Sequence, residues 1–349
     1  MATIKQIAQA VGVSSATVSR VLNADATMSV SAATRQRILD TAEALDYVTP
    51  RNRKRPGIPG LSKIALAHFL DPAQELIDPY YVGMRLGIER RCQALKIETV
   101  KVYHADRLLQ RALAQPDAGI IAIGPRTAPE LEWLERFGRN VVFADWAPPG
   151  EAFDAVLSDL VQATRRLLEE LAGQGYRRIG FVGWIDEDST DPYAEIRCTT
   201  YLDWMRRAGC YDASLCATEL NEARNREETG YRVGLRLLDL PQRPDAIVAC
   251  NDNVAVGLYR AIDERGLRVP RDVAVASFND ISVAQFLNPP LSTVHLPAEE
   301  IGEAAVDLLA ERATGRAIGK RVTLSTRMIW RGSTRQTPAA KSTNRNAGR

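Results

Sequence analysis

The sequence predicts an α + α/β protein in which a three-helix helix-turn-helix headpiece precedes a core of two α/β lobes. Three observations lead to this expectation. Residues 1–47 contain three short amphipathic helical patterns, the first two joined by a glycine turn. Residues 48–62 are rich in Pro, Gly and positive charge, which is typical of a domain boundary. From residue 63 to residue 331, short apolar strands alternate with amphipathic helices, a pattern that indicates parallel sheets covered by helices.

The three helices of residues 1–47 each have a recognisable beginning. Thr3 and Gln6 have the spacing of a capping box, and Gly12 can adopt the left-handed conformation that ends a helix sharply. Ser14 is expected to cap a second helix with an inward face of Val18, Val21 and Leu22. Ser31 is expected to cap a third helix, whose packing side chains are predicted to be Ile38, Leu39, Ala42 and Leu45.

The outward face of the second helix has the chemistry of a DNA-reading surface. Its side chains are Ser15, Ala16, Thr17, Ser19 and Arg20. Small side chains allow a helix to approach base edges, and a guanidinium can donate two hydrogen bonds to guanine. Capped helices around a glycine turn are common, however, so the periodicity alone leaves a plain helical bundle equally open.

Composition restricts the class of protein. Hydrophobic residues make up 45% and charged residues 25% of the 349, which is ordinary for a globular protein. No apolar run reaches the ~20 residues that span a bilayer, and Met1 leads into the first helix without a signal-peptide pattern. We therefore expect a cytoplasmic protein with no membrane partner. Five cysteines without C-x-x-C spacing and only three histidines predict no metal site.

Charge is unevenly distributed along the chain. The formal net charge is +2, but residues 1–60 hold eight basic side chains against four acidic ones. The segment after Arg331 adds four basic residues and no acid, so the middle of the chain is acidic. Basic ends fit contact with phosphate, although ordinary surface variation would explain a difference of this size as well.

Polar and aromatic side chains follow several predicted strands of the core, where ligands of open parallel sheets bind. About 270 residues are too many for one such sheet, so we expect two lobes whose strand ends face a common cleft. These side chains suit a polyhydroxylated ligand, because carboxylates and amides pair with hydroxyls and a Tyr ring can cover a sugar face. Helix capping and lobe packing remain alternative roles for each of them. The candidates are Asp78, Tyr80, Tyr81, Asp159, Arg197, Asn251, Asn279 and Asp280.

Enzyme signatures are missing from the sequence. No G-x-G-x-x-G, G-x-x-x-x-G-K-[ST], G-x-S-x-G or H-E-x-x-H occurs, so we expect neither catalysis nor a cofactor. An exported sugar receptor would need a signal peptide. Residues 332–349 carry no leucine heptad and are predicted to form a disordered basic tail. One helix-turn-helix buries little surface, so a homodimer on palindromic DNA is expected.

The string VSSATVSRVLN, between TIKQIAQAVG and ATRQRILDTAEALDY, resembles the headpiece of LacI/GalR-family transcriptional regulators. The resemblance implies that Ser15, Ala16 and Arg20 read base edges, with Ala16 touching a thymine methyl or merely permitting approach. It also implies a set of phosphate contacts, namely Thr3, Ser14, Thr17, Ser19 and Asn23.

The core resembles the same family along LVQATRRLLEELAGQGYRRIGFVG, AIVACNDNVAVGLYRAIDERGLRVPRDVAVASFNDI and NPPLSTVHL. This resemblance implies a periplasmic-binding-protein-like fold with a sugar effector between the lobes. It assigns the effector contacts to Tyr80 or Tyr81, Asp159, Arg197, Asn251 and Asn279 or Asp280. IDPYYVGMRLGIE and SFNDI are most similar to regulators of β-galactoside operons, which suggests a repressor released by a galactoside, with an activator or another effector as alternatives.

The linker departs from the family pattern. Family members usually place a leucine from a hinge helix in the minor groove, whereas Pro56 and Pro59 would interrupt such a helix here. Ile58 is poorly suited to replace that leucine in the minor groove, because Pro and Gly flank it in the sequence. The basic side chains could instead enter a narrow minor groove or act as a flexible tether on phosphates, and the two remain equally open. They are Arg51, Arg53, Lys54 and Arg55.

Overall fold

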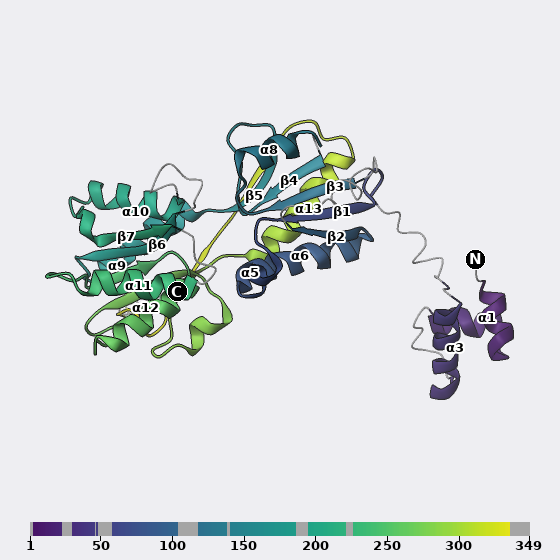
Figure 1. Cartoon of the computed structure of the whole chain (residues 1–349). Helices are drawn as coiled ribbons and strands as arrows, with labels where there is room; N and C mark the ends of the chain where they lie inside the picture. The colour runs from purple at the N-terminus through teal and green to yellow at the C-terminus, as the bar shows by residue number, and fades with distance from the viewer. Residues whose placement is uncertain are drawn as a thin grey trace, which may run out of the picture. The chain divides into compact units, whose positions relative to one another are not determined.

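The computed structural model describes residues 3–22, 30–45, 47, 58–103, 118–137, 140–185, 195–220 and 226–335. The chain divides into two compact units, Met1–Pro59 and Gly60–Arg349. The first is the small helical unit and the second contains both sheets (Figure 1). No helix within the described ranges is long and apolar enough to cross a membrane.

The first unit contains α1 (Ile4–Val11), α2 (Ser15–Leu22) and α3 (Ala32–Ala44). Both hydrogen bonds of the predicted capping box at Thr3 and Gln6 are present, and Gly12 ends α1 with a φ of 75°. The Ser14 hydroxyl accepts a hydrogen bond from the Thr17 amide at 3.0 Å, and Ser31 caps α3 through the Thr34 amide in the same way. The sequence predicted these helix starts correctly.

The core of this unit is smaller than predicted. Its buried side chains are Ile7, Ala8, Val11, Val18, Val21, Ile38 and Ala42. The expected burial of Leu39 and Leu45 was wrong, because these side chains are 42% and 41% exposed. The inward stripe of α3 passes through Ile38 and Ala42, one helical turn apart. Leu39 is rotated by about 100° from that stripe, and Leu45 follows the last residue of α3.

The second unit consists of two lobes, each built on a six-stranded sheet. In the first lobe the strand order is β11-β5-β4-β3-β1-β2, and all neighbouring strands are parallel. The bounds are β1 Lys63–His68, β2 Glu98–Tyr103, β3 Ala118–Ile123, β4 Val141–Ala144, β5 Asp154–Ser158 and β11 Arg321–Leu324. The strands β3 and β4 are buried along their whole length, as expected for a parallel sheet covered by helices.

The second lobe repeats this plan with the order β12-β10-β9-β8-β6-β7. Only β12 runs antiparallel among the described pairings, at the edge beside β10. The bounds are β6 Ile179–Ile185, β7 Cys216–Leu220, β8 Ala246–Ala249, β9 Ala274–Asn279, β10 Ser292–His295 and β12 Arg327–Ile329. The predicted two-lobed α/β core is therefore confirmed.

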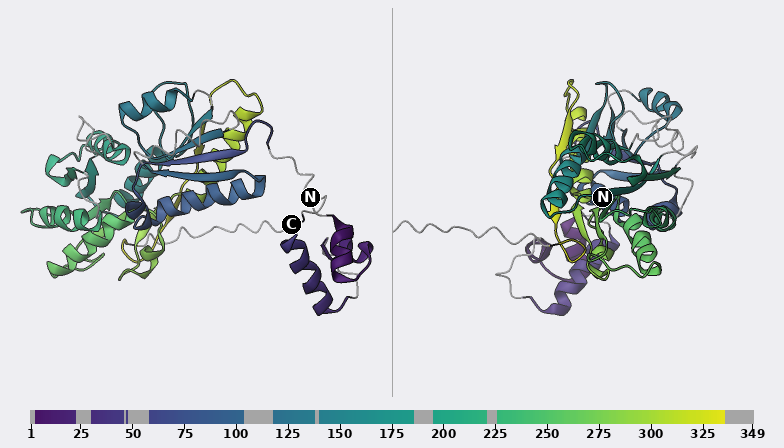
Figure 2. Two further views of the ribbon diagram at one scale, coloured as in Figure 1. Left: turned by 45° about the vertical axis from the view of Figure 1, so that its right-hand side comes forward. Right: turned by 90° about the vertical axis from the view of Figure 1, so that its left-hand side faces the viewer.

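Helices flank both sheets (Figure 2). Those of the first lobe are α5 Pro72–Leu76, α6 Pro79–Leu95, α8 Ala128–Glu135 and α13 Ala298–Ala313. Those of the second lobe are α9 Leu160–Gly173, α10 Ile196–Arg207, α11 Arg226–Leu238 and α12 Asp252–Glu264. Short 3-10 turns occupy Ala213–Leu215 and Ser282–Phe286.

Each lobe contains one pair of helices whose backbones lie in direct contact. A Cβ atom at Gly87 of α6 would collide with the main chain of Glu299 in α13. In the second lobe a Cβ atom at Gly257 of α12 would collide with the main chain of Glu227 in α11. Glycine is required at both positions because any side chain would separate the paired helices.

Three segments connect the lobes: Asp159, residues 296–297 and residues 325–326. The third is part of the long yellow stretch that runs from one lobe to the other in Figure 1. After most of the second lobe, the chain returns to the first lobe with α13 and β11. It then crosses to the second lobe again, where β12 lies at the edge of the sheet.

The boundaries of the core differ from the predicted 63–331. Leu61 is already buried, and Gly60 belongs to the second unit. At the other end, the predicted disordered tail was wrong for residues 332–335. Ser333 and Thr334 are buried, and the Ser333 hydroxyl donates to the Val275 carbonyl at 2.6 Å. These polar groups are bonded to the sheet, a contact that composition does not reveal. Residues 48–57 and 336–349, and the helix expected near residues 108–113, lie outside the described residues.

Candidate effector cleft and nucleic-acid interface

A cleft of about 260 Å³ lies between the two lobes. Phe69, Pro125 and Asp145 reach it from the ends of β1, β3 and β4, and Trp184 reaches it from β6. The amino ends of α6, α9, α10 and α11 contribute Tyr81, Leu160, Glu195, Ile196, Arg197 and Arg226, and Trp146 follows Asp145. Strand ends of both sheets therefore converge on one cavity, as the sequence predicted.

Asp145 supplies a carboxylate on the first-lobe side of the cleft. The Tyr80 and Tyr81 hydroxyls at the start of α6 donate to its two oxygens at 2.6 and 3.0 Å. Burial raises the pKa of Asp145, although the two hydrogen bonds act in the opposite direction. Asp145 also has a φ of 69°, which turns the chain sharply after β4. The arrangement fixes an acceptor for a hydroxyl donor in the cleft.

Arg197 supplies the main cationic group on the second-lobe side. Its Nε lies 2.6 Å from the Glu195 carboxylate, and both side chains are largely buried. Glu195 also accepts from the Cys198 amide at 3.0 Å and so caps α10. Burial acts to lower the pKa of Arg197, but the neighbouring carboxylate of Glu195 raises it, and the net shift is upward. Arg197 is thus a charged and oriented donor.

Arg226 and Asp78 join the two lobes beside the cleft. The Arg226 guanidinium, at the start of α11, lies 2.9 Å from the Asp78 carboxylate at the amino end of α6. The guanidinium also lies over the Trp184 ring, 4.4 Å from its centroid. A second contact between the lobes is close by, where the Asn253 side chain donates to the Ile77 carbonyl at 3.3 Å. The cleft therefore has charged and hydrogen-bonded contacts that span it.

Aromatic rings form the apolar part of the cleft. The lining includes Phe69, Tyr81, Trp146 and Trp184. Phe69 and Tyr81 pack edge to face with their centroids 5.0 Å apart, which holds both rings in place. Rings that lie beside fixed hydrogen-bonding groups are suited to a ligand with an apolar C–H face and polar hydroxyls.

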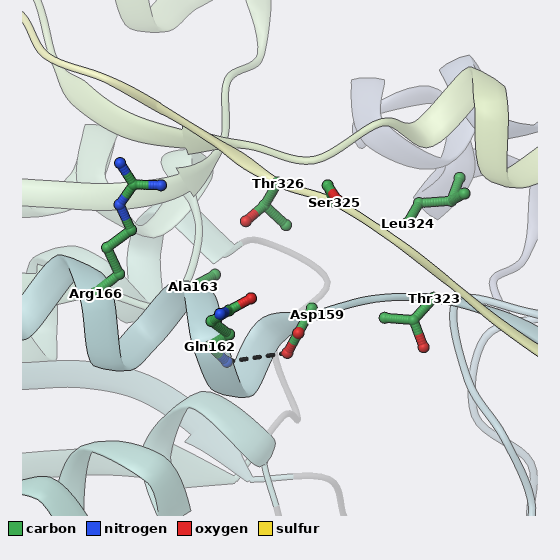
Figure 3. A pocket seen from close by; sticks show the side chains of 8 residues that line it. All are labelled: Asp159, Gln162, Ala163, Arg166, Thr323, Leu324, Ser325 and Thr326. Atoms are coloured by element: carbon green, nitrogen blue, oxygen red, sulfur yellow. Dashed lines mark hydrogen bonds between the residues drawn. The ribbon is translucent and has the colours of Figure 1, made fainter.

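The predicted effector residues divide into two groups. Tyr80, Tyr81 and Arg197 meet around the cleft, with Asp78 directly behind it in the ion pair with Arg226. Asp159 instead caps α9 through the Gln162 amide at 3.0 Å and lines a different pocket. That pocket has a volume of about 350 Å³ and lies where the chain crosses between the lobes, beside Ser325 and Thr326 (Figure 3).

The three other predicted residues have contacts elsewhere in the second lobe. Asn251 is 1% exposed and caps α12 through the Val254 amide. Asn279 ends β9 with a φ of 105°. Asp280 pairs with Arg331 at 2.6 Å and with His295 at 3.3 Å. None of these three side chains lines the cleft described above.

Three charged residues of the cleft, Asp145, Glu195 and Arg226, were not predicted from the sequence. Asp145 could have been found, because it follows the strand pattern NVVFA just as the selected residues follow theirs. Glu195 lies two positions before Arg197, a separation that gives no signal without the helix boundary. Arg226 carries no local signal, since its partner Asp78 is 148 positions earlier in the chain.

The exposed surface of α2 carries the predicted DNA contacts. Ser15, Ala16 and Arg20 are exposed, whereas Thr17 and Ser19 are half-buried. Ser14 and Thr3 are also exposed at the amino ends of α2 and α1. The buried face of α2 holds the unit together, so its polar face is available to a partner. Five further predicted contacts lie outside the described residues: Asn23, Arg51, Arg53, Lys54 and Arg55.

Neither a metal site nor a disulfide is present in the part of the chain that the structure describes. No group of three or more His, Cys, Asp or Glu side chains is placed to hold a metal ion there. The cysteines are free, and three of them, Cys92, Cys198 and Cys250, are buried.

Comparison with known families identifies both units. Residues 3–50 match the bacterial regulatory proteins of the lacI family, and residues 168–334 match the periplasmic binding protein-like domain. Over 336 residues the chain is 34% identical to the HTH-type transcriptional repressor MelR of Bacillus subtilis (strain 168), with 95% of this chain and 97% of the relative covered.

Two further similarities bear on the two units. The chain is 61% identical over 113 residues to a lactose operon repressor of Rhizobium radiobacter, which covers 32% of this chain and 100% of that sequence. Among solved structures, a complex of the transcriptional regulator CelR with cellobiose is similar, with a TM-score of 0.70 and 26% identity. That similarity covers 95% of this chain and 100% of the other.

Proposed function

The chain belongs to the lacI family of bacterial regulatory proteins, and we propose that it represses a sugar-utilisation operon until a small sugar binds between its lobes. The cleft supports the sugar part of this proposal. It combines aromatic rings with a fixed acceptor, Asp145, and a fixed donor, Arg197. This combination suits paired hydroxyls above an apolar sugar face.

A galactoside is the effector that we propose. The motifs IDPYYVGMRLGIE and SFNDI resemble those of regulators of β-galactoside operons, including the repressor of the evolved β-galactosidase operon. In the first motif, Asp78, Tyr80 and Tyr81 begin α6 beside the cleft. The lactose operon repressor that is similar over 113 residues adds support.

The proposed effector contacts are Tyr81, Asp145, Glu195, Arg197 and Arg226, because these side chains line the cleft. Tyr80 and Asp78 would act through Asp145 and Arg226, which they contact. The sequence-based assignment of effector contacts to Asp159, Asn251, Asn279 and Asp280 stays a prediction, and the lining of the cleft favours the five residues above instead.

For the headpiece we propose that α2 enters the major groove of an operator half-site. Ser15, Ala16 and Arg20 would meet base edges, because they share the exposed face of this helix. Hydroxyl groups within α2 and at the amino ends of α1 and α2 would hold phosphates, which fixes the position of the headpiece without reading sequence. These are Thr3, Ser14, Thr17 and Ser19, with Asn23 and the basic linker proposed from the sequence alone.

A homodimer through the core would bring two headpieces to a palindrome. Exposed apolar side chains support it: Leu76 and Ile77 in the first lobe, and Val283 and Phe286 in the second. Phe286 is 79% exposed. The two sets are close together, because Asn253 bonds to Ile77 and the adjacent Asp252 accepts from the Ile281 amide. Such a patch on both lobes is suited to an interface that responds to lobe closure.

The regulation would be a population shift between two lobe arrangements. A sugar in the cleft contacts both lobes, so it binds the two arrangements with different affinity. The same free-energy difference would weaken operator binding, because linkage makes the effect reciprocal. The Asp78–Arg226 pair would be broken or kept according to the separation of the lobes.

A mobility-shift titration tests the whole proposal. The purified protein should hold an operator fragment more tightly than bulk competitor DNA, and a galactoside should release it. A panel of galactosides and other sugars, with calorimetry on the same panel, identifies the effector. Tighter operator binding in the presence of sugar would contradict release by sugar. It would indicate an activator, or a repressor for which the sugar is a co-repressor. If the protein bound no DNA fragment more tightly than competitor DNA, the proposal of a sequence-specific regulator would be wrong.

A further inference from the structure

The cations that line the cleft are already neutralised by carboxylates of this chain. Arg197 lies 2.6 Å from Glu195, and Arg226 lies 2.9 Å from Asp78. All four side chains are largely buried. Within the described ranges these two arginines are the cationic residues of the lining. An anionic ligand would share each guanidinium with a buried carboxylate that already neutralises its charge, so its own charge would gain little.

Three of the helix amino termini at the cleft, those of α6, α9 and α10, are already capped by carboxylates of this chain. Helix amino termini are ready anion sites, because their free amides and dipole favour negative charge. Here Asp78 caps α6, Asp159 caps α9 and Glu195 caps α10, each through a carboxylate oxygen on a main-chain amide. These helices contribute Tyr81, Leu160 and Arg197 to the lining. Their ends therefore present negative charge where a phosphate would bind.

The remaining charged groups near the cleft increase the excess of acidic over available basic side chains. Asp145 adds a third carboxylate, whose hydrogen-bond partners are two hydroxyls. The nearby cation that favours its charge is Arg197, which is already paired with Glu195. Arg126 follows the lining residue Pro125, but its guanidinium donates to the Ala67 and Ile123 carbonyls. Glu130 also accepts from Arg126. The acids at the cleft thus outnumber the available cations.

We propose that the cleft accepts an uncharged sugar and excludes its phosphorylated and carboxylated counterparts, with Asp78 and Glu195 as the residues that set this discrimination. The inference rests on the proposed sugar-binding function and specifies its ligand class. A neutral glycoside can donate its hydroxyl protons to Asp145 and Glu195 and accept from the two arginines. A phosphate offers only acceptors at physiological pH and meets three carboxylates.

Calorimetry with matched ligand pairs tests the discrimination on the full-length protein. The pairs are galactose with galactose 6-phosphate and with galacturonate, lactose with lactose 6-phosphate, and cellobiose with cellobiose 6-phosphate. We expect heat for at least one neutral sugar and an affinity at least about 30-fold lower for its anionic counterpart. Equal or tighter binding of the anion would overturn the inference while leaving a sugar-responsive regulator. If no ligand of either kind gave heat, the proposed sugar binding would be wrong, and the inference that rests on it would be wrong as well.

The variant Asp78→Asn tests the cause of the discrimination. Asparagine keeps the cap of α6, since it is as good a capping residue as aspartate, but it leaves the Arg226 charge uncompensated. We expect the preference for the neutral sugar to shrink about tenfold, mainly through tighter binding of the phosphate.

Asp239→Asn is the matched control. It also removes one carboxylate from an Arg–Asp pair, but Asp239 follows the far end of α11, about 20 Å along that helix from Arg226. The control should keep the full preference. If the preference for the neutral sugar decreased equally in both variants, the discrimination would come from net charge. This result would overturn the proposed roles of Asp78 and Glu195.

Discussion

The two units of this protein place their candidate functional side chains in opposite ways. In the headpiece the proposed base-reading side chains, Ser15, Ala16 and Arg20, come from one helix, are exposed and lie outside the core of the unit. In the cleft they come from positions between Phe69 and Arg226, and most of the charged ones are buried and paired with one another.

This difference has a physical reason. A groove of DNA is a fixed external surface, so a reading helix needs only to be stable and to expose a suitable face. A small ligand must be surrounded, and a chain surrounds it by bringing several strand ends to one place. Charges in such a cavity lose water, so each needs a partner from the chain. The variants below test whether the two units are independent in this way.

The largest expected effect is the loss of sugar binding in Asp145→Asn, which should weaken it by about 100-fold or more. Asparagine tolerates the left-handed backbone at this position, but its amide replaces an acceptor that two tyrosine hydroxyls and the ligand use. Calorimetry measures the sugar affinity, and mobility shift without sugar should be unchanged.

Asp159→Asn is the control for that prediction. Asp159 is also an acid that follows a first-lobe strand, but it lines the pocket at the lobe crossing. We expect its sugar affinity to stay within about threefold of the parent. A loss as large as that of Asp145→Asn would mean that the sugar contacts the crossing pocket.

A second prediction concerns the pH dependence of the core. Asp252 is fully buried, and burial raises its pKa from 3.8 to about 6, despite hydrogen bonds from Ser277, Thr293 and the Ile281 amide. The folded state therefore binds this proton more tightly than the unfolded state does. The contribution to stability is greatest below about pH 4 and decreases as the pH rises to about 6. Its size is on the order of 3 kcal/mol.

Urea unfolding of the parent and of Asp252→Asn between pH 4 and pH 7.5 measures this contribution. The difference in free energy of unfolding between the two proteins should change through about pH 6 and level off above about pH 7. Parallel curves would show that Asp252 is ionised throughout. Operator binding by the headpiece should not follow this titration if the units are independent.

A third prediction concerns sequence reading by α2. Arg20→Ala should cost about 1–3 kcal/mol on the operator and relax the preference at one base pair, because it removes a forked donor from an exposed helix face. Mobility shifts on single-base operator variants measure this effect. Equal weakening on every DNA sequence would assign Arg20 to phosphate. Sugar affinity should not change.

The smallest expected effect separates capping from phosphate contact at Thr3. Both Thr3→Ala and Gln6→Ala break the capping box of α1 and should lower headpiece stability by about 1 kcal/mol. If Thr3 also holds a phosphate, Thr3→Ala should reduce operator affinity more than Gln6→Ala. The salt dependence should be the same in both variants, because a neutral hydroxyl releases no counterion. Identical operator affinities of the two variants would leave Thr3 with capping alone.

The sequence predicted the headpiece better than it predicted the cleft. Helix starts at Thr3, Ser14 and Ser31 were predictable because a cap needs only residues three positions apart. Leu39 was misassigned because a short helix gives little phase information about its inward stripe. In the cleft, Tyr81 was proposed from a strand end and Arg197 from the start of a helix, whereas Arg226 was missed. Asp159, which was also proposed from a strand end, lines a different pocket.

The sequence by itself determined the helices of the headpiece, the exposed face of α2 and the alternation of strands and helices, because each depends on interactions between residues close in the chain. The tertiary structure decided which strand ends share a cavity, which carboxylate neutralises which arginine, and that Ser333 and Thr334 belong to the core. Those outcomes depend on three crossings between the lobes, which bring together groups that local periodicity cannot relate.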